Sequence, residues 1–320
     1  MTIITIDGFS MRLPGAASRR TVLDDVSLDV APGWCVGIVG ESGSGKSLLT
    51  RAILGSFPAG AEVSGQITVD GVDIVGSSAK QRREIRRAVA GIVFQDPRAS
   101  VNPLHPIEDF LLEAVTTSGQ LTRVAARARA MELLTIMRLR EPARVLRSYP
   151  DELSGGMLQR VVIAAAMMPA PKVLICDEAT TALDVTTQAE IVQLLRRLRE
   201  ETGVAVVFVT HDLDLAGELC DELCVLYAGQ VQERGPADAV LSAPRHPYTS
   251  ALLAAIPRVS DPIGHRLPAI PGGVLPLAAD GTGCRFSARC ARYRSPDCDV
   301  PSIPTIAVGD RVLRCVQVSA

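Results

Sequence analysis

Residues 40–47 of this 320-residue chain read GESGSGKS. The run follows an apolar stretch at residues 35–39, which we expect to be a strand, and precedes apolar residues at helical spacing over 48–54. A glycine-rich loop between a strand and a helix can turn its backbone N–H groups onto phosphate oxygens, and the helix N-terminus adds positive potential. The sequence therefore predicts a phosphate-binding loop in an α/β protein.

The residue types in this loop suit a nucleoside triphosphate. Lys46 is expected to neutralise the β- and γ-phosphates, and the hydroxyl of Ser47 to hold Mg²⁺. The predicted ATP-binding residues are Gly40, Glu41, Ser42, Gly43, Ser44, Gly45, Lys46 and Ser47. Kinases, GTPases and many ATPases share such a loop, so the loop alone does not choose among them.

Two carboxylates follow a second apolar run. Asp177 and Glu178 come directly after VLIC at residues 173–176, and ligands gather at the carboxyl ends of strands in α/β sheets. We expect Asp177 to hold Mg²⁺ and Glu178 to orient or deprotonate the attacking water. His211 follows the apolar run 204–210, where an imidazole could contact the γ-phosphate, although a lone histidine is more often structural.

The remaining pattern divides the chain into segments. Short β-type stretches fill the first 30 residues, with a hairpin predicted at Pro14–Ala17, and a charged helix is expected over about 78–89 between two further strands. Apolar residues at helical spacing dominate 96–170, whereas residues 173–210 alternate strand, helix and strand, which favours a parallel sheet. VLYAG and QVQERG read as a hairpin, and beyond residue 235 proline and glycine become frequent.

Composition excludes several classes of function. The net charge of -2 gives no field for a polyanion, so we expect no nucleic-acid partner. No apolar run approaches the roughly 18 residues that cross a bilayer. The first residues show no secretory signal, which makes the cytosol the expected compartment.

Residues 153–160 read LSGGMLQR, and here the sequence resembles the ABC ATPase family over residues 1 to about 235. A serine and two glycine N–H groups at a helix N-terminus can form a second anion site. The resemblance implies that this site caps the γ-phosphate of ATP bound by an opposing subunit. The implied residues are Ser154, Gly155, Gly156 and Gln159.

Three further marks of the family follow in order. Gln95 in FQDP matches its Q-loop, Asp184 in TALD its D-loop, and His211 its switch histidine. The resemblance implies catalytic roles for Glu178, His211 and Gln95, and Mg²⁺ bound through Ser47, Gln95 and Asp177. One departure is Leu13, an aliphatic residue where the family stacks an aromatic on adenine.

The family also implies a fold. We expect an α/β protein with a P-loop NTPase core, which is a RecA-like parallel sheet, together with an antiparallel β subdomain and an inserted helical subdomain at about 96–170. These make a nucleotide-binding domain over residues 1–235, and residues 236–320 form a C-terminal extension that contains cysteines.

Several stretches resemble the ATPases of dipeptide and oligopeptide importers, among them FQDPRASVNPL and the run APRHPYTSALLAAIP at 243–257. The resemblance implies a second, paralogous ATPase, two transmembrane permease subunits and an extracytoplasmic solute-binding protein. The chain would then lie at the cytoplasmic face of the membrane as a peripheral subunit. The alternatives are an importer of nickel or another small solute, an exporter subunit, and a soluble ABC factor.

Four cysteines in the extension have five, seven and sixteen residues between them: Cys284, Cys290, Cys298 and Cys315. Zinc sites usually contain a pair two to four residues apart, whereas four thiolates without such pairs can hold an iron–sulfur cluster. Some peptide-importer ATPases carry a [4Fe-4S] cluster on a similar tail, so we expect one here. Arg285 and Ala291 depart from that tail, and zinc or unligated thiols stay open. Four other cysteines lie in apolar patterns and are expected to be buried: Cys35, Cys176, Cys220 and Cys224.

Overall fold

The computed structural model describes residues 2–15, 19–257, 268–273 and 283–317. Contacts between Cα atoms divide the chain into two compact units that do not follow the order of the sequence. Unit 1 consists of Met1–Ile4, Val30–Cys35 and Thr68–Thr210, and unit 2 of Thr5–Asp29, Val36–Ile67 and His211–Ala320. The predicted domain boundary near residue 235 therefore stays a prediction.

Unit 1 contains three parallel strands in the order β6, β7, β8. Their bounds are β6 (Ala90–Val93), β7 (Val173–Asp177) and β8 (Ala205–Thr210), and Ile175 of β7 lies opposite Ile92 and Val207. Every residue of β7 and β8 is buried, which explains the continuous apolar runs in the sequence. Helix α7 (Val185–Thr202) precedes β8 and ends at Gly203, whose φ of 69° is left-handed.

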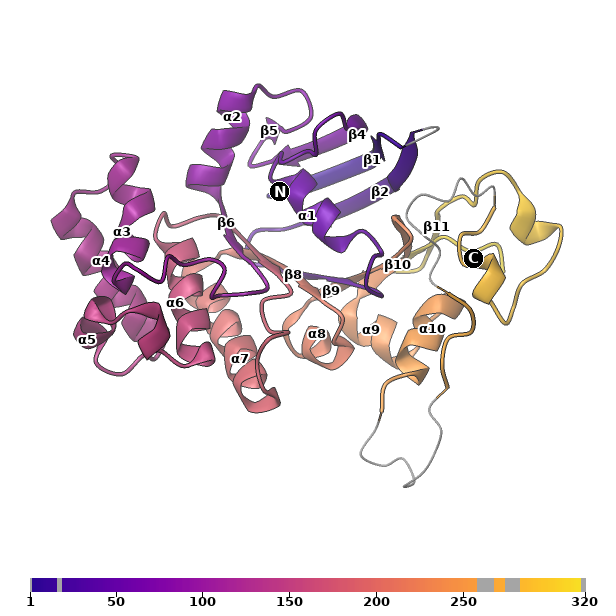
Figure 1. Cartoon of the computed structure of the whole chain (residues 1–320). Helices are drawn as coiled ribbons and strands as arrows, with labels where there is room; N and C mark the ends of the chain where they lie inside the picture. Colours follow the sequence, from indigo (N-terminus) through magenta and orange to yellow (C-terminus); the bar gives the residue numbers. More distant parts are fainter. Residues whose placement is uncertain (1, 16–18, 258–267, 274–282, 318–320) are drawn as a thin grey trace. The chain divides into compact units, whose positions relative to one another are not determined.

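Four helices of unit 1 gather into one lobe, as Figure 1 shows: α3 (Ile107–Thr117), α4 (Arg123–Ile136), α5 (Pro142–Arg147) and α6 (Gly155–Met167). Apolar residues at helical spacing, such as Leu111, Leu133 and Leu158, are buried in it. A 3₁₀ turn, η2 (Pro150–Glu152), precedes α6. The predicted charged helix is present but has two parts, α2 (Ala79–Glu84) and the π-helical turn η1 (Ile85–Val89). The short strand β5 (Val72–Asp73) pairs with the end of β4 (Glu62–Val69).

Unit 2 contains an antiparallel β subdomain and a second set of strands. The subdomain has the order β2, β1, β4, with β1 (Ile4–Leu13), β2 (Arg20–Val30) and β4 (Glu62–Val69). Ile4 and Ile6 of β1 are buried at alternate positions, and beyond Gly8, whose φ of 54° is left-handed, the buried alternate residues are Phe9 and Met11. The hairpin predicted at Pro14–Ala17 lies partly outside the described residues.

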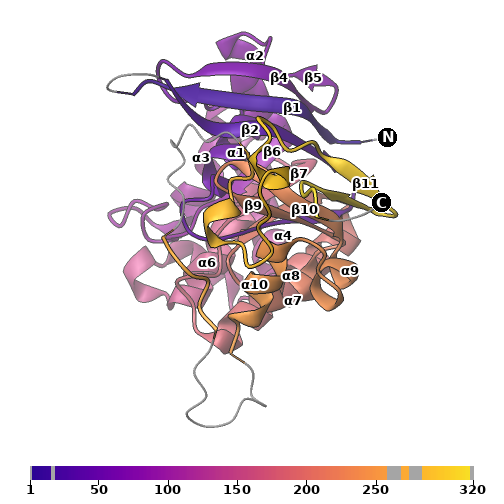
Figure 2. The same ribbon diagram turned by 90° about the vertical axis from the view of Figure 1, so that its right-hand side faces the viewer.

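The other strands of unit 2 run in the order β11, β12, β10, β9, β3. Strand β3 (Cys35–Val39) is parallel to β9 (Glu222–Tyr227), and β9 forms the predicted hairpin with β10 (Gln230–Pro236). The C-terminal strands β11 (Ile306–Val308) and β12 (Arg311–Leu313) continue this sheet from β10, and they are the yellow strands of Figure 2. The extension is therefore a structural part of unit 2.

Short helices complete unit 2. They are α1 (Lys46–Ile53), α8 (Leu213–Leu219), α9 (Ala237–Ser242), α10 (Pro247–Ala254), and the 3₁₀ turns η3 (Ser287–Arg289) and η4 (Asp297–Asp299). The four cysteines expected in apolar patterns are buried. Within the described residues, no helix has both the length and the apolar character required to span a bilayer.

Candidate nucleotide site

The predicted phosphate-binding loop lies in unit 2 between β3 and α1, and its shape depends on glycine. Gly40 has a φ of 150°, and a Cβ there would lie 2.1 Å from the carbonyl oxygen of Leu226. Gly45, with a φ of 108°, immediately precedes α1. The N–H of Gly229, in the turn after β9, donates to the carbonyl oxygen of Ser44 at 2.8 Å. The loop is thus packed closely against the β9–β10 hairpin.

The interior of the loop offers the groups that a phosphate requires. The buried ammonium of Lys46 donates to the carbonyl oxygens of Gly40 at 2.8 Å and Glu41 at 3.0 Å. The hydroxyl oxygen of Ser44 is buried and has no hydrogen-bond partner among the described residues. A buried hydroxyl without a partner is costly, so the loop fits a ligand that brings hydrogen-bonding oxygens.

Unit 1 carries the two carboxylates at the end of β7. Asp177 is the last residue of that buried strand. Glu178 has a left-handed φ of 54°, and its N–H donates to the carbonyl oxygen of Val209 at 3.0 Å. Left-handed backbone is unfavourable for a residue with a Cβ and persists where its surroundings impose it, which is common at functional sites. The bond to β8 therefore fixes the direction in which the chain leaves the sheet.

The LSGGMLQR motif forms the beginning of α6 in unit 1. Ser154 is the N-cap, and its hydroxyl accepts the N–H of Met157 at 3.3 Å. A Cβ on Gly156 would lie 2.7 Å from Cγ2 of Thr187, so this glycine permits close packing against α7. Gln159 is fully buried, and neither atom of its amide has a partner in the described part of the chain. The predicted contact of Gln159 with a nucleotide on another subunit stays a prediction.

Asp184 caps the helix that packs on this motif. Its carboxylate accepts the N–H of Thr187 at 3.0 Å and the hydroxyl of the same residue at 2.7 Å. These bonds lower the pKa of the Asp184 carboxyl below its ordinary value, so it stays ionised at neutral pH. Thr187 thereby links the motif glycine Gly156 to the D-loop position.

The other predicted residues are divided between the units. Gln95 belongs to unit 1 and comes shortly after β6, whereas His211, the residue after β8, belongs to unit 2, and both are exposed. Leu13, where an adenine-stacking aromatic was expected, is half-buried at the end of β1. Unit 2 thus contains the phosphate loop and the histidine, whereas unit 1 contains the glutamine, the two carboxylates and the LSGGMLQR motif.

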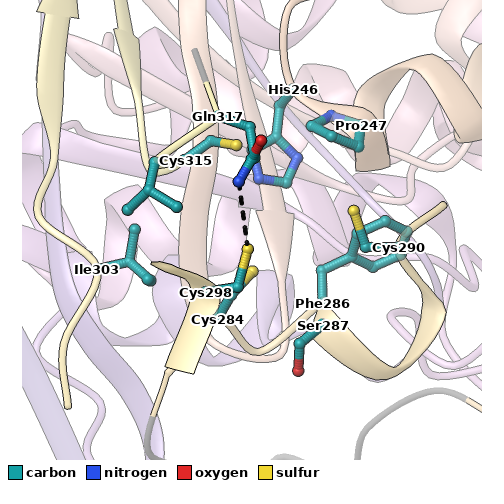
Figure 3. Close-up of a pocket in the computed structure, with 11 residues that line it drawn as sticks. His246, Pro247, Cys284, Phe286, Ser287, Cys290, Cys298, Ile303, Cys315 and Gln317 are labelled. Carbon is teal, nitrogen blue, oxygen red and sulfur yellow. Dashed lines mark hydrogen bonds between the residues drawn. The ribbon is translucent and has the colours of Figure 1, made fainter. Parts of the chain in front are cut away.

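The four cysteines of the extension line a single pocket, shown in Figure 3, together with His246 and Phe286. Burial raises the pKa of the Cys284 thiol to about 11 and also raises that of Cys290, so these thiols stay protonated without a ligand. Burial lowers the pKa of His246 to about 4. In the described residues, however, no group of three or more His, Cys, Asp or Glu side chains is arranged to hold a single metal ion.

Two residues near the loop were missed by sequence reasoning. The hydroxyl of Tyr248 and the guanidinium of Arg289 both bind Glu41, the second residue of the phosphate loop. Tyr248 lies in the run APRHPYTSALLAAIP, which pointed to a family branch and not to the nucleotide site. Its separation of 207 residues from Glu41 leaves no local pattern that could connect the two.

A glycine-rich phosphate loop between strand and helix, with an Asp–Glu pair after a buried parallel strand, defines the class of P-loop nucleotide hydrolases. Family models refine this assignment. Residues 23–181 match the model described as ABC transporter, and residues 232–298 match the one described as oligopeptide/dipeptide transporter, C-terminal region.

Individual proteins agree with these matches. A putative peptide import ATP-binding protein of Brucella abortus is 41% identical over 92% of this chain and 88% of its own. The dipeptide transport ATP-binding protein DppD of Escherichia coli K12 is 40% identical over 97% of this chain and 95% of its own. The solved structure of the ATP-binding cassette MJ0796 with ADP and Pi has 30% identity and a TM-score of 0.65, covering 73% of this chain and 98% of that one. The chain belongs to the ABC transporter family, as an ATP-hydrolysing subunit.

Proposed function

We propose that this chain hydrolyses ATP to power the import of dipeptides or oligopeptides across the cytoplasmic membrane. The observation that carries the proposal is the match of residues 232–298 to the oligopeptide/dipeptide transporter C-terminal region. Residues 232–236 of this region belong to β10, a strand of the unit that contains the phosphate loop. Relatives named as dipeptide transport ATP-binding proteins align with nearly the whole chain, which supports the same cargo class.

The proposed chemistry gives each of the predicted site residues a role. The loop N–H groups and Lys46 would bind the phosphates, and Ser47, Gln95 and Asp177 would be the oxygen ligands of Mg²⁺, which when bound would supply positive charge to the transferring phosphoryl group. Glu178 orients or deprotonates the attacking water, and His211 contacts the γ-phosphate. The hydrogen bond from the N–H of Glu178 to the carbonyl oxygen of Val209 supports this role, because it fixes the backbone from which the Glu178 side chain extends.

A second ATPase completes the proposed assembly. Ser154, Gly155 and Gly156 begin a 13-residue helix and leave N–H groups that can cap a phosphate held by an opposing subunit. We expect this partner to be a paralogue, so that the ATPase dimer is a heterodimer. Because ATP binds the closed dimer more tightly than the open one, ATP binding shifts the population toward closure and hydrolysis reverses the shift.

The proposed membrane partners are two permease subunits, which receive peptide from an extracytoplasmic solute-binding protein. Unit 1 exposes large apolar side chains on and near the helical lobe: Phe94 is 47% exposed, Leu104 81% and Tyr149 46%. Phe94 adjoins Gln95, so a permease segment bound there would reach a catalytic residue directly. This arrangement supports a peripheral position at the cytoplasmic face of the membrane.

We also propose a [4Fe-4S] cluster on Cys284, Cys290, Cys298 and Cys315. The donor set is four thiols around one pocket that also contains Phe286 and Ile303. Four cysteine thiolates are the usual ligand set of a [4Fe-4S] cluster, and the spacing of these cysteines lacks the close pair that is typical of zinc sites. Protein purified without oxygen should contain iron and sulfide and absorb broadly near roughly 400 nm. Stoichiometric zinc in the purified protein, or the absence of both iron and zinc, would contradict the proposed cluster.

The first test concerns the catalytic role of Glu178 in ATP hydrolysis and uses the Glu178→Gln variant. We expect ATP turnover to fall by about 10² or more while ATP still binds, because the amide cannot accept the water proton. Glu201→Gln is the matched control, since Glu201 is an exposed glutamate of α7. Near-normal hydrolysis by Glu178→Gln would contradict its catalytic role.

The trapped variant also identifies the partners. With ATP and Mg²⁺, tagged Glu178→Gln protein recovered from detergent-solubilised native membranes should bring two polytopic permeases and a second ATPase. Recovery with ribosomes or other soluble factors alone would overturn the transport assignment, but it would not contradict the assignment as an ATPase. Uptake assays with labelled peptides and with nickel would then separate peptide import from the import of another solute.

A further inference from the structure

Glu41, in the phosphate loop, is bound by an arginine from the C-terminal extension. The guanidinium of Arg289 donates from Nη1 to Oε2 at 2.7 Å and from Nη2 to Oε1 at 3.0 Å, which is a bidentate ion pair. The side chains are only 5% and 22% exposed, respectively. Paired hydrogen bonds of this kind fix orientation as well as distance, and partial burial protects them from screening by salt.

Arg289 is itself held in place on its other sides. Its Nε donates to the carbonyl oxygen of Pro271 at 2.9 Å, and Nη1 also reaches the hydroxyl of Tyr227 at 3.4 Å. The guanidinium lies over the ring of Tyr227, 5.7 Å from its centroid, and that ring is fully buried at the end of β9. The arginine is therefore a rigid support on which Glu41 is held.

A second group of the extension fixes the backbone of the same residue. The hydroxyl of Tyr248 accepts the N–H of Glu41 at 3.0 Å. Tyr248 is fully buried, with its ring 4.7 Å from that of Tyr227 and 5.2 Å from that of Phe286. Both the side chain and the N–H of Glu41 are thus bound by residues 236–320.

The third polar group of Glu41 points into the loop. Its carbonyl oxygen accepts the ammonium of Lys46 at 3.0 Å and the N–H of Ser44 at 3.2 Å. These two residues form the phosphate-binding interior. The Glu41 peptide, which the extension holds, is therefore one of the groups that fix where Lys46 and Ser44 lie.

We propose that Arg289 is a positioning residue for the phosphate loop. By holding Glu41, it keeps the loop in its binding shape before ATP arrives, so that less conformational entropy is lost on binding. Arg289 touches neither the reacting atoms nor the phosphates in this role, and it acts through Glu41. The inference rests on the assignment of the loop as the ATP site, and it adds a residue of the C-terminal extension to the groups that shape that site.

The test compares ATP affinity among whole-chain variants, with a fluorescent ATP analogue as the probe. In Arg289→Met we expect the dissociation constant to rise about tenfold, because the loop must order as it binds. Arg289→Lys keeps the charge but loses the second hydrogen bond, so its affinity should lie between those of the parent and the methionine variant. In steady-state assays KM should rise while kcat changes less than twofold, because the loop adopts the same shape once ATP is bound.

A matched control separates positioning from general destabilisation. Arg314 is another buried arginine of the extension, and it binds Asp25 at 2.8 Å without touching the loop. Arg314→Met should lower the thermal unfolding temperature without raising the dissociation constant for ATP. Equal losses of ATP affinity in both methionine variants would overturn the proposal.

A double-mutant cycle provides the second criterion. Glu41→Gln should weaken ATP binding like Arg289→Met, and the two changes combined should be no worse than either alone, because they remove one interaction. Additive losses would overturn the proposal, and so would unchanged affinity in Arg289→Met. If Arg289→Met does not fold, Glu41→Gln and Arg289→Lys carry the same test. Failure of the parent protein to bind the probe would instead contradict the ATP site itself.

Discussion

At the scale of single residues, the packing of Gly156 against Thr187 connects two motifs that lie apart in the sequence. The Thr187 hydroxyl donates to Asp184 at 2.7 Å, so this side chain cannot rotate away without losing that bond. Its Cγ2 occupies the space that a Cβ on Gly156 would need. Gly156 is therefore needed for packing against Thr187, apart from any role that the motif has in binding a nucleotide.

Gly156→Ala should lower the free energy of unfolding by about 1–3 kcal/mol, the usual effect of overpacking. Thr187→Ser removes Cγ2 and keeps the hydroxyl, so the double variant Gly156→Ala, Thr187→Ser should recover most of the loss. Denaturant unfolding of the parent, both single variants and the double variant measures the effect. A double variant less stable than Gly156→Ala would show that the clash is not the cause.

The residues of the candidate site differ in how far the sequence could predict them. Lys46 and Ser154 belong to short runs whose chemistry is local, and the structure places both at helix N-termini as expected. The pair Arg289 and Glu41 is separated by 248 residues, and no spacing rule connects positions that far apart. The sequence therefore predicts local structure where a motif lies within one short run, and it gives no pattern where the fold brings distant segments together.

At the scale of elements, strands were predictable when burial is continuous. Both β7 and β8 are buried throughout, so their apolar runs are unambiguous. In contrast, β11 and β12 have three residues each and lie in a proline-rich region. They are strands because β12 pairs with the edge of β10. The hydrophobic periodicity of the sequence does not indicate this pairing.

Helices α6 and α7 are joined through Arg160. Its Nη1 donates to the carbonyl oxygen of Met137 at 2.8 Å, and its Nη2 pairs with the carboxylate of Glu190 at 2.6 Å. Arg160→Ala should destabilise unit 1 by about 2 kcal/mol, because it removes both charge-assisted bonds and leaves the carbonyl without its donor. Glu190→Gln should cost less than about 1 kcal/mol, since this carboxylate is largely exposed. Equal effects in denaturant unfolding would contradict the role assigned to the carbonyl bond.

At the scale of the whole molecule, the extension completes unit 2. Glu233 of β10 is fully buried, and its carboxylate binds Arg311 at 3.2 Å and the backbone N–H groups of Arg245 at 3.0 Å and His246 at 2.9 Å. All three partners come from residues beyond 236. Without them, a buried carboxylate has lost three donors, and such a loss is strongly destabilising.

A chain that ends at Pro236 should therefore fail to accumulate as soluble protein or to bind ATP. The control is a chain that ends at Gln317, which keeps every described element. Soluble yield and binding of a fluorescent ATP analogue distinguish the two. A soluble short chain with parental affinity would show that residues 1–235 form an independent domain, as the sequence suggested.

The division of unit 2 into three separated segments has a consequence for how the protein is made. Tyr248 and Arg289 emerge from the ribosome 207 and 248 residues after Glu41 of the phosphate loop. Contacts between such distant segments form slowly and only when both partners are present. Over that stretch of synthesis a nascent chain carries the loop without the groups that shape it, and its affinity for ATP should rise once they have emerged.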